Sequence, residues 1–345
     1  MDRRVDWYYY RNDNCIRGMK TEVLQGKIAL KRASELIAQG EVVAFPTETV
    51  YGLGANAFDS EAVSKIFVAK GRPNDNPLIV HVADKSDITP LVDYISPYAQ
   101  AIIDNFMPGP ITVIMPKSDK VPSNVSAGLS TVGIRMPMHP VAREFIRECG
   151  LPIAAPSANN STHISPTSAK HVYDDMQGKI PLIVDGGNCE VGIESTIIDT
   201  TTDVPTILRP GAITAQDLAK VLGQVVNFTG EVIVAKAPGM KYKHYAPTCE
   251  MVVAKELADA LAEYDRKSKN CRPVLICSTI WTQKVGDRRV IDVGDNDKQV
   301  ARNIYGAMHE AQEIGDYIIC QDFGDSGVML SVMNRVIKAS GGKRI

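Results

Sequence analysis

The sequence predicts an α/β protein with a larger domain built on a twisted, mixed sheet and a smaller domain of alternating strands and helices. In the first 222 residues, strand-like segments outnumber helical ones, which favours a mixed sheet over strict βα alternation. From residue 248 onward, apolar runs alternate with amphipathic segments, which is typical of a Rossmann-like domain. A chain of 345 residues has room for two such domains.

The larger domain is expected over residues 21–222. A helix over 27–39 ends at Gly40, and a buried strand over 41–45 follows it. Asp59 is placed to cap a helix over 60–69, which Gly71 ends. Further strands are expected over 78–82, 111–115, 133–135, 153–155, 182–185, 195–199 and 206–209, and further helices over 97–106, 140–148, 169–176 and 215–222.

Residues 223–247 are punctuated by Gly and Pro, and we expect them to link the domains. The Rossmann-like domain then covers residues 248–345. Its strands are expected over 251–253, 274–276, 290–293 and 317–319, and its helices over 256–266, 299–314 and 328–339.

Composition limits the compartment and the class of partner. No stretch approaches the roughly 20 apolar residues that cross a bilayer, so we expect a soluble protein. The formal net charge of −2 argues against a protein that mainly coats nucleic acid. Seven cysteines without a C-x-x-C pair are typical of reduced thiols, and they indicate a cytoplasmic location. Residues 1–20 read as an N-terminal extension, because 1–18 lack a leader pattern.

Polar and basic residues gather in three Gly-, Pro- or Ser-rich segments near predicted strand ends, where α/β proteins bind ligands. These segments are FPTETVYGLG at 45–54 with AKGRPNDNP at 69–77, APSANNS at 155–161, and GIEST at 192–196. Basic side chains beside hydroxyl groups suit a phosphorylated or carboxylated ligand. The run GLGANA at 52–57 fits the loose dinucleotide pattern, but six residues separate it from its strand, which argues against such a site.

Several of these side chains also have ordinary structural interpretations. Lys70 and Arg72 alone would fit a solvated helix end. Arg135, on a short apolar strand, needs an anion, and both Glu194 and a substrate carboxylate remain open as its partner. His81, in an apolar strand, is more typical of a core histidine than of a catalytic one.

Two acidic residues, Asp185 and Glu194, fit either an acid–base pair or ligands of Mg²⁺. The remaining histidines lack metal-ligand spacing, so we expect no metal held by the protein itself.

With these segments in view, the chain resembles the threonylcarbamoyl-AMP synthase family, whose catalytic module is called YrdC-like. The family's K-x-R and S-x-N elements read here as Lys70, Arg72, Ser157 and Asn159. Thr162 stands where the family commonly has Gly, and Ala237 where it commonly has Ser. Further shared segments, which extend the match over roughly residues 21–345, are PGPIT at 108–112, GIRMP at 133–137, LRPG at 208–211 and PGMKYKHYAP at 238–247.

The resemblance implies a YrdC-like domain followed by a Rossmann-like domain, and condensation of L-threonine, bicarbonate and ATP to threonylcarbamoyl-AMP and pyrophosphate. It also implies that the product goes to downstream tRNA threonylcarbamoyl transferase proteins. Because Mg²⁺ usually binds through substrate phosphates, we expect it to arrive with ATP. The near-neutral charge predicts no strong direct binding of nucleic acid. We expect the segment 238–247 to close over the site as a lid.

The resemblance also assigns roles to individual residues. The implied catalytic residues are Lys70, Arg72, Ser157 and Asn159. The implied threonine contacts are Thr47, Thr49, His81, Arg135, Ala155 and Ser195. The implied ATP contacts are Arg72, Asn76, Thr131, Ser157, Ser165, Arg209 and Tyr245.

Two other functions would account for parts of the sequence. A non-catalytic RNA-binding module would use the basic residues Arg266, Lys267, Lys269 and Arg272, but the near-neutral chain shows no RNA-binding signature. A carbamoyltransferase of the hydrogenase-maturation type shares the YrdC-like module, but it should also show zinc-finger and acylphosphatase segments, and we see neither in this sequence.

Overall fold

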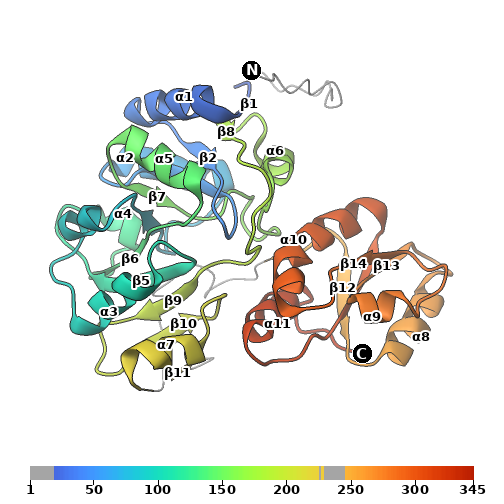
Figure 1. Cartoon of the computed structure of the whole chain (residues 1–345). Helices are drawn as coiled ribbons and strands as arrows, with labels where there is room; N and C mark the ends of the chain where they lie inside the picture. The colour runs from blue at the N-terminus through green and yellow to red at the C-terminus, as the bar shows by residue number, and fades with distance from the viewer. Residues whose placement is uncertain (1–18, 225–226, 229–244) are drawn as a thin grey trace.

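The computed structural model describes residues 19–224, 227–228 and 245–345. The described part forms two α/β domains that lie side by side (Figure 1). The strands of the large domain are β1 (Glu22–Leu24), β2 (Val43–Phe45), β3 (Gly52–Asn56), β4 (Ile79–His81), β5 (Ile111–Pro116), β6 (Thr131–Arg135), β7 (Ile153–Ala155), β8 (Leu182–Val184), β9 (Thr196–Asp199), β10 (Thr206–Arg209) and β11 (Asn227–Phe228). Its helices are α1 (Gly26–Ala38), α2 (Ser60–Lys70), α3 (Pro97–Phe106), α4 (Ser123–Ser126), α5 (Pro140–Cys149), α6 (Ala169–Met176) and α7 (Ala215–Leu222), with a 3₁₀ helix at Lys85–Leu91.

The large domain is built on one mixed, eleven-stranded sheet in the order β1-β8-β2-β3-β7-β4-β6-β5-β9-β10-β11. Parallel pairs such as β4–β6 alternate with antiparallel pairs such as β2–β3, as expected when strands outnumber helices. Successive strand residues pack on opposite faces. Val43 packs with α1 and α5, whereas Ala44 packs with α2, α3 and α6. The predicted mixed sheet is confirmed.

The small domain has a four-stranded, all-parallel sheet in the order β12-β15-β13-β14. Helix α8 covers one face, and α10 and α11 cover the face nearer the large domain. The predicted alternation is confirmed, although α9 was missed. The elements are β12 (Glu250–Ala254), α8 (Leu257–Lys267), β13 (Pro273–Cys277), α9 (Thr279–Thr282), β14 (Val290–Asp292), α10 (Asp297–Ile314), β15 (Tyr317–Gln321) and α11 (Val328–Ala339).

Strand β3 was not among the strands expected from the sequence. Gly52 and Gly54 lie in a buried strand that pairs with β2 and β7. A Cβ at Gly54 would lie 2.6 Å from a methyl of Ile153 and 2.9 Å from the ring of Phe45. Close packing against Phe45, together with Ala155 at Gly52 and Ile153 at Gly54, therefore explains the two glycines without a bound dinucleotide.

The segment predicted as the interdomain linker differs in one respect. Asn227–Phe228 forms β11, which pairs with β10, so the large sheet continues beyond residue 222. Most of the predicted lid, including Ala237, lies outside the described residues, which resume at Tyr245.

The two domains share an apolar cluster. Val50, Ile164 and Ile193 of the large domain pack with buried residues of α10 and α11. A Cβ at Gly192, whose φ is +77°, would collide with the backbone of α10 at Arg302. At this point the backbone of the large domain at Gly192 packs directly against the backbone of α10 in the small domain.

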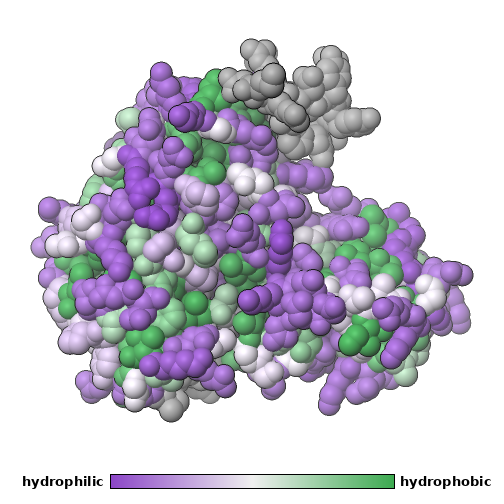
Figure 2. Space-filling view, viewed as in Figure 1, coloured by the Kyte–Doolittle hydropathy of each residue, from purple (hydrophilic) through white to green (hydrophobic). Residues whose placement is uncertain are grey.

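Polar side chains cover much of the visible face of both domains, with apolar groups scattered among them (Figure 2). Among the described residues, no helix combines the length and the apolar character that spanning a membrane requires.

Candidate active site

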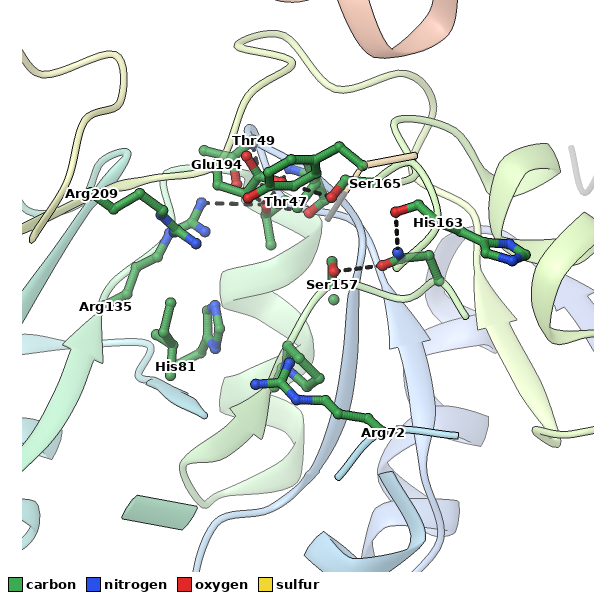
Figure 3. Close-up of a pocket in the computed structure, with 17 residues that line it drawn as sticks. Thr47, Thr49, Arg72, His81, Arg135, Ser157, His163, Ser165, Glu194 and Arg209 are labelled. Atoms are coloured by element: carbon green, nitrogen blue, oxygen red, sulfur yellow. Dashed lines mark hydrogen bonds between the residues drawn. The ribbon is translucent and has the colours of Figure 1, made fainter. Parts of the chain in front are cut away.

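The candidate site lies in the large domain at the carboxyl ends of two neighbouring parallel strands, β4 and β6. Their last residues, His81 and Arg135, are direct partners in the register of the sheet. Ser157, just after β7, forms a bridge with Gly52 at the start of β3. Figure 3 shows Arg135, Arg209 and His81 gathered on one side of the pocket, with Ser157 and Arg72 on another. Polar groups at the carboxyl ends of strands are expected at a ligand site in an α/β fold.

Eleven of the predicted site residues line this pocket: Thr47, Thr49, Arg72, His81, Arg135, Ala155, Ser157, Asn159, Ser165, Arg209 and Tyr245. Four others, Lys70, Asn76, Thr131 and Ser195, are not among its lining residues. Segments that are more than 160 residues apart in the sequence therefore meet at one place, which the separate motifs alone could not establish.

Arg135 has a buried partner, but it is not the one considered from the sequence. Its Nη2 donates to Glu48 Oε1 at 2.7 Å and to Thr47 Oγ1 at 3.3 Å, with both members of the ion pair almost fully buried. Glu194, the structural partner left open from the sequence, is used elsewhere. Arg135 Nε has no hydrogen-bond partner among the described residues. A buried guanidinium with an unused donor can still receive a ligand carboxylate.

His81 lies beside Arg135 and is only 4% exposed. Burial, together with the neighbouring charge of Arg135, lowers the pKa of His81 to about 3. Its imidazole is therefore neutral at physiological pH. It can accept or donate a hydrogen bond to a ligand, but it cannot supply a permanent positive charge.

Lys70, the first residue of the K-x-R element, is buried behind the pocket. Its Nζ donates to the carbonyl oxygens of Ser157 and Asn159, and to Asn159 Oδ1 at 3.3 Å. Burial and the charge of Arg72 hold its pKa well below the usual range. The Nζ of Lys70 thus holds the S-x-N turn in place, through the backbone of Ser157 and Asn159 and the side chain of Asn159.

Arg72 does reach the pocket, because Gly71 ends α2 in the left-handed conformation and turns the chain. Its Nη2 donates to the carbonyl oxygens of Asn76 and Pro77 at 3.0 and 3.4 Å. Asn76 supports Arg72 through its backbone, while its buried Oδ1 has no partner among the described residues.

Arg209 and Glu194 also line the pocket. Arg209 donates to the carbonyl oxygen and to the hydroxyl of Ser195. Glu194 accepts from Ser165 Oγ at 2.7 Å and pairs with Arg335 of α11 at 3.0 Å. Burial opposes ionisation of Glu194, but Arg335 and Arg209 outweigh it and lower its pKa to about 2.

Two residues near the pocket have unusual backbone conformations. Thr162, which follows the S-x-N turn, has φ of +76°, and its carbonyl oxygen accepts from Ala246 N at 2.9 Å. Tyr245 has φ of +65° and is buried. A β-branched residue at positive φ is strained, which explains why this position commonly holds Gly in the family that the sequence resembles.

Asp185 and Glu194 do not form a pair. Asp185 accepts from Gln25 Nε2 at 2.7 Å and from the amide of Gly187, whereas Glu194 contacts Arg335. Within the described ranges, no group of three or more His, Cys, Asp or Glu side chains is arranged to hold a metal ion.

The sequence interpretation missed the structural roles of Glu48, Arg335 and His163. His163 lines the pocket, and its Nδ1 lies 3.0 Å from Asp175, which raises the pKa of the imidazole. Glu48 lies inside the motif at 45–54, so its position in the sequence could have indicated that it belongs to the site. Arg335 lies on a remote helix in an apolar run, and only the tertiary structure connects it with Glu194.

Comparison with known proteins places these features in one family. A family model described as "Telomere recombination" matches residues 35–211, and one described as "Threonylcarbamoyl-AMP synthase, C-terminal domain" matches residues 213–341. A threonylcarbamoyl-AMP synthase from Pyrococcus abyssi is 42% identical, covering 90% of this chain and 94% of its own length. One from Bacillus subtilis is 42% identical, covering 92% of this chain and 94% of its own.

A solved structure agrees with this relationship. The crystal structure of P. abyssi Sua5 complexed with L-threonine superposes with a TM-score of 0.87 at 40% identity, over 94% of this chain and 98% of that one. Both domains are therefore matched in sequence and in fold. The chain belongs to the threonylcarbamoyl-AMP synthase family, in its two-domain form.

Proposed function

We propose that this chain condenses L-threonine, bicarbonate and ATP into threonylcarbamoyl-AMP and pyrophosphate. The observation that carries the proposal is a single pocket lined by three arginines, Arg72, Arg135 and Arg209, and by the side chains of Thr47 and Thr49. Family membership supplies the reaction, and the pocket supplies groups of the right charge for it.

The first step forms a carbamate. The amine of L-threonine attacks bicarbonate, a C–N bond forms, and water leaves. Arg135 Nε and the neutral imidazole of His81 lie where they can hold the amino-acid carboxylate. Thr47 and Thr49, whose hydroxyls lie 2.9 Å apart, would contact the substrate hydroxyl. Ser195 is fully buried and bonded to Thr112 and Arg209, so we assign it to holding Arg209.

In the second step, a carbamate oxygen attacks the α-phosphorus of ATP, and pyrophosphate leaves as the P–O bond breaks. Negative charge grows on the leaving group, so fixed cations stabilise the transition state more than the ground state. We assign this role to Arg72 and Arg209. We assign Lys70 an indirect role, because it positions the Ser157–Asn159 turn. No side-chain nucleophile is required, and positioning of the two anions does most of the work.

Mg²⁺ would enter with the phosphates of ATP, because Mg²⁺ usually leans on substrate oxygens and retained waters. Glu194 is occupied by Arg335, Tyr305 and Ser165, which argues against a role as a metal ligand.

The product would pass to downstream tRNA threonylcarbamoyl transferase proteins in the cytoplasm. Direct tRNA binding by this chain is expected to be weak. In the basic segment near 266–272, Arg266, Lys267 and Arg272 pair with Glu263, Glu250 and Asp316. Pairing of this kind reduces the charge available to phosphates.

The test is to incubate the full chain with ATP, Mg²⁺, bicarbonate and L-threonine, and to measure pyrophosphate and the mass of the adenylate. Three controls each omit one of ATP, bicarbonate and threonine. We expect both products only in the complete mixture. Pyrophosphate release that does not depend on threonine would contradict the proposal.

A further inference from the structure

A buried polar cluster lies where the small domain meets the candidate site. Its centre is Glu194, which lines the pocket and is 6% exposed. Ser165, from the large domain, donates to its Oε1. The other two side chains on this carboxylate, Tyr305 and Arg335, come from α10 and α11 of the small domain and are fully buried.

Tyr305 and Arg335 hold Glu194 from two directions. The Tyr305 hydroxyl lies 3.0 and 2.9 Å from the two carboxylate oxygens. Arg335 Nε donates to Oε2 at 3.0 Å, while its Nη1 donates to the carbonyl oxygen of Pro210 at 2.6 Å. Pro210 directly follows Arg209, and Glu194 directly precedes Ser195, which accepts from Arg209. Arg335 thus bridges the two chain segments that set the position of Arg209.

The neighbouring helix turn adds a second connection. Ser331 Oγ donates to the carbonyl oxygen of Gly211 at 2.9 Å. Gly211 has no side chain because its Cα lies against the backbone of Ser195 and Thr196. Small displacements of α11 would therefore reach the backbone around Ser195.

Arg335 also compensates the negative charge of Glu194. Glu194 is negatively charged at physiological pH, and its carboxylate faces the same pocket as Arg209. Without Arg335, the charge of Arg209 would mainly compensate Glu194, and an incoming phosphate would meet an uncompensated carboxylate. With Arg335 present, the cluster of Glu194, Arg209 and Arg335 has a net charge of about +1, which favours an anion.

We infer that Arg335, together with Tyr305, is a positioning residue for the nucleotide half of the site, acting through Glu194 and the carbonyl oxygen of Pro210. The small domain therefore completes the nucleotide site, while the threonine half is built within the large domain. This inference rests on the proposed function, because it assigns Arg209 and Ser165 to ATP.

The test compares Tyr305→Phe and Arg335→Lys with matched controls in the full chain. Tyr305→Phe removes one hydroxyl and keeps the packing. Tyr317→Phe is its control, because the Tyr317 hydroxyl also bonds a glutamate of the small domain, Glu263, at 2.8 Å. Arg288→Lys is the control for Arg335→Lys, because Arg288 pairs with Asp265 at the surface.

Each variant is assayed for the KM of ATP, the KM of threonine, and the melting temperature. Since hydrogen bonds to charged groups are strong, we expect the KM of ATP to rise about tenfold in Tyr305→Phe and in Arg335→Lys. The KM of threonine should change less than about twofold, and both controls should match the wild type. Folded variants with an unchanged KM for ATP, or with equal changes in both KM values, would overturn the inference.

A double variant tests the electrostatic part. Arg335→Met leaves Glu194 with one cation fewer, so it should weaken ATP binding more than Arg335→Lys does. Adding Glu194→Gln removes the uncompensated carboxylate and should recover much of this loss. A double variant no better than Arg335→Met would overturn the charge argument. A wild-type chain that makes no adenylate would instead refute the proposed function.

Discussion

Two buried arginine–glutamate pairs flank the candidate site, and they are built in different ways. Arg135 and Glu48 belong to one domain, with Arg135 at the carboxyl end of β6 and Glu48 in the loop between β2 and β3. Glu194 and Arg335 are 141 residues apart and meet only where the two domains touch. The comparison indicates that the Arg135–Glu48 pair can form as soon as the large domain folds, whereas the Glu194–Arg335 pair also needs the small domain in place.

The largest effect should appear in the choice of amino acid at the Arg135 end. Valine lacks the hydroxyl that Thr47 and Thr49 can bond, whereas serine lacks only a methyl. We expect kcat/KM for pyrophosphate release to fall about 10⁴-fold with valine, and only about 10- to 200-fold with serine. Parallel steady-state assays with the three amino acids provide the measurement. A higher kcat/KM with valine than with serine would show that Thr47 and Thr49 do not recognise the substrate hydroxyl.

Glu48→Gln should damage the pair within the large domain. Arg135 would lose its only carboxylate among the described residues, so the free energy of unfolding should fall by about 3 kcal/mol. The KM of threonine should rise more than the KM of ATP. Urea denaturation and steady-state kinetics measure the two effects.

The control for Glu48→Gln is Glu41→Gln, which breaks a partly exposed pair with Lys65 and should cost less than about 1 kcal/mol. If Glu48→Gln raised both KM values equally, the proposed division of the site would fail.

Arg72→Ala tests a cation that belongs to neither pair. We expect pyrophosphate release to fall about 10²- to 10³-fold, because a fixed donor to the developing charge is lost. The melting temperature should stay within a few degrees, since Arg72 Nη2 donates to the carbonyl oxygens of a loop, at Asn76 and Pro77. Lys65→Ala on the exposed side of α2 is the control. Normal turnover of Arg72→Ala would remove this residue from the site.

Acidification should affect the two ends in different pH windows. The pKa of His81 is about 3 in the folded chain against 6.5 ordinarily, so the unfolded chain binds more protons between these values. Stability is therefore lost as pH falls below about 6.5, by about 2 kcal/mol on reaching pH 5. Glu194, with its pKa lowered from 4.5 to about 2, contributes a loss only below about pH 4.5.

Urea unfolding of wild type and His81→Asn at pH 7 and pH 5 isolates the contribution of His81. His171, whose pKa is also lowered to about 3, contributes equally to both chains and cancels in the difference. An identical acid-induced loss in the two chains would show that His81 does not drive it.

The smallest effect is expected at Thr162, in the turn between the two ends. Thr162→Gly should raise the free energy of unfolding by up to about 1 kcal/mol, because relief of the positive-φ strain exceeds the added chain entropy. Ser161→Gly, at an ordinary φ, should lower it instead. Denaturant midpoints of the two variants give the comparison, and destabilisation by both would mean that Thr162 is not strained.

The sequence predicted most elements of the fold because their signals are local. The bounds of α6, α7 and α11 follow from apolar periodicity and caps, and those of β7 and β10 from short apolar runs. Strand β3 was missed because glycine does not favour strands, and its glycines are required only by tertiary packing against Phe45.

The site shows the same limit. Motif residues such as Ser157 and Arg72 were identified from the chain, but the burial of Lys70 behind them was not. The partners Glu48 and Arg335 depend on which surfaces meet, and a single sequence does not contain that information directly. Whether each residue contacts the ligand assigned to it stays a prediction.

The apolar cluster around Val50, Ile164 and Ile193 also affects the solubility of the chain during folding, before the two domains dock. If synthesis or folding of the small domain failed, these three side chains would form an exposed hydrophobic patch on the large domain. Exposed patches of this kind promote aggregation and capture by chaperones. Docking of the small domain covers these three side chains, so we expect a chain without a folded small domain to aggregate more readily.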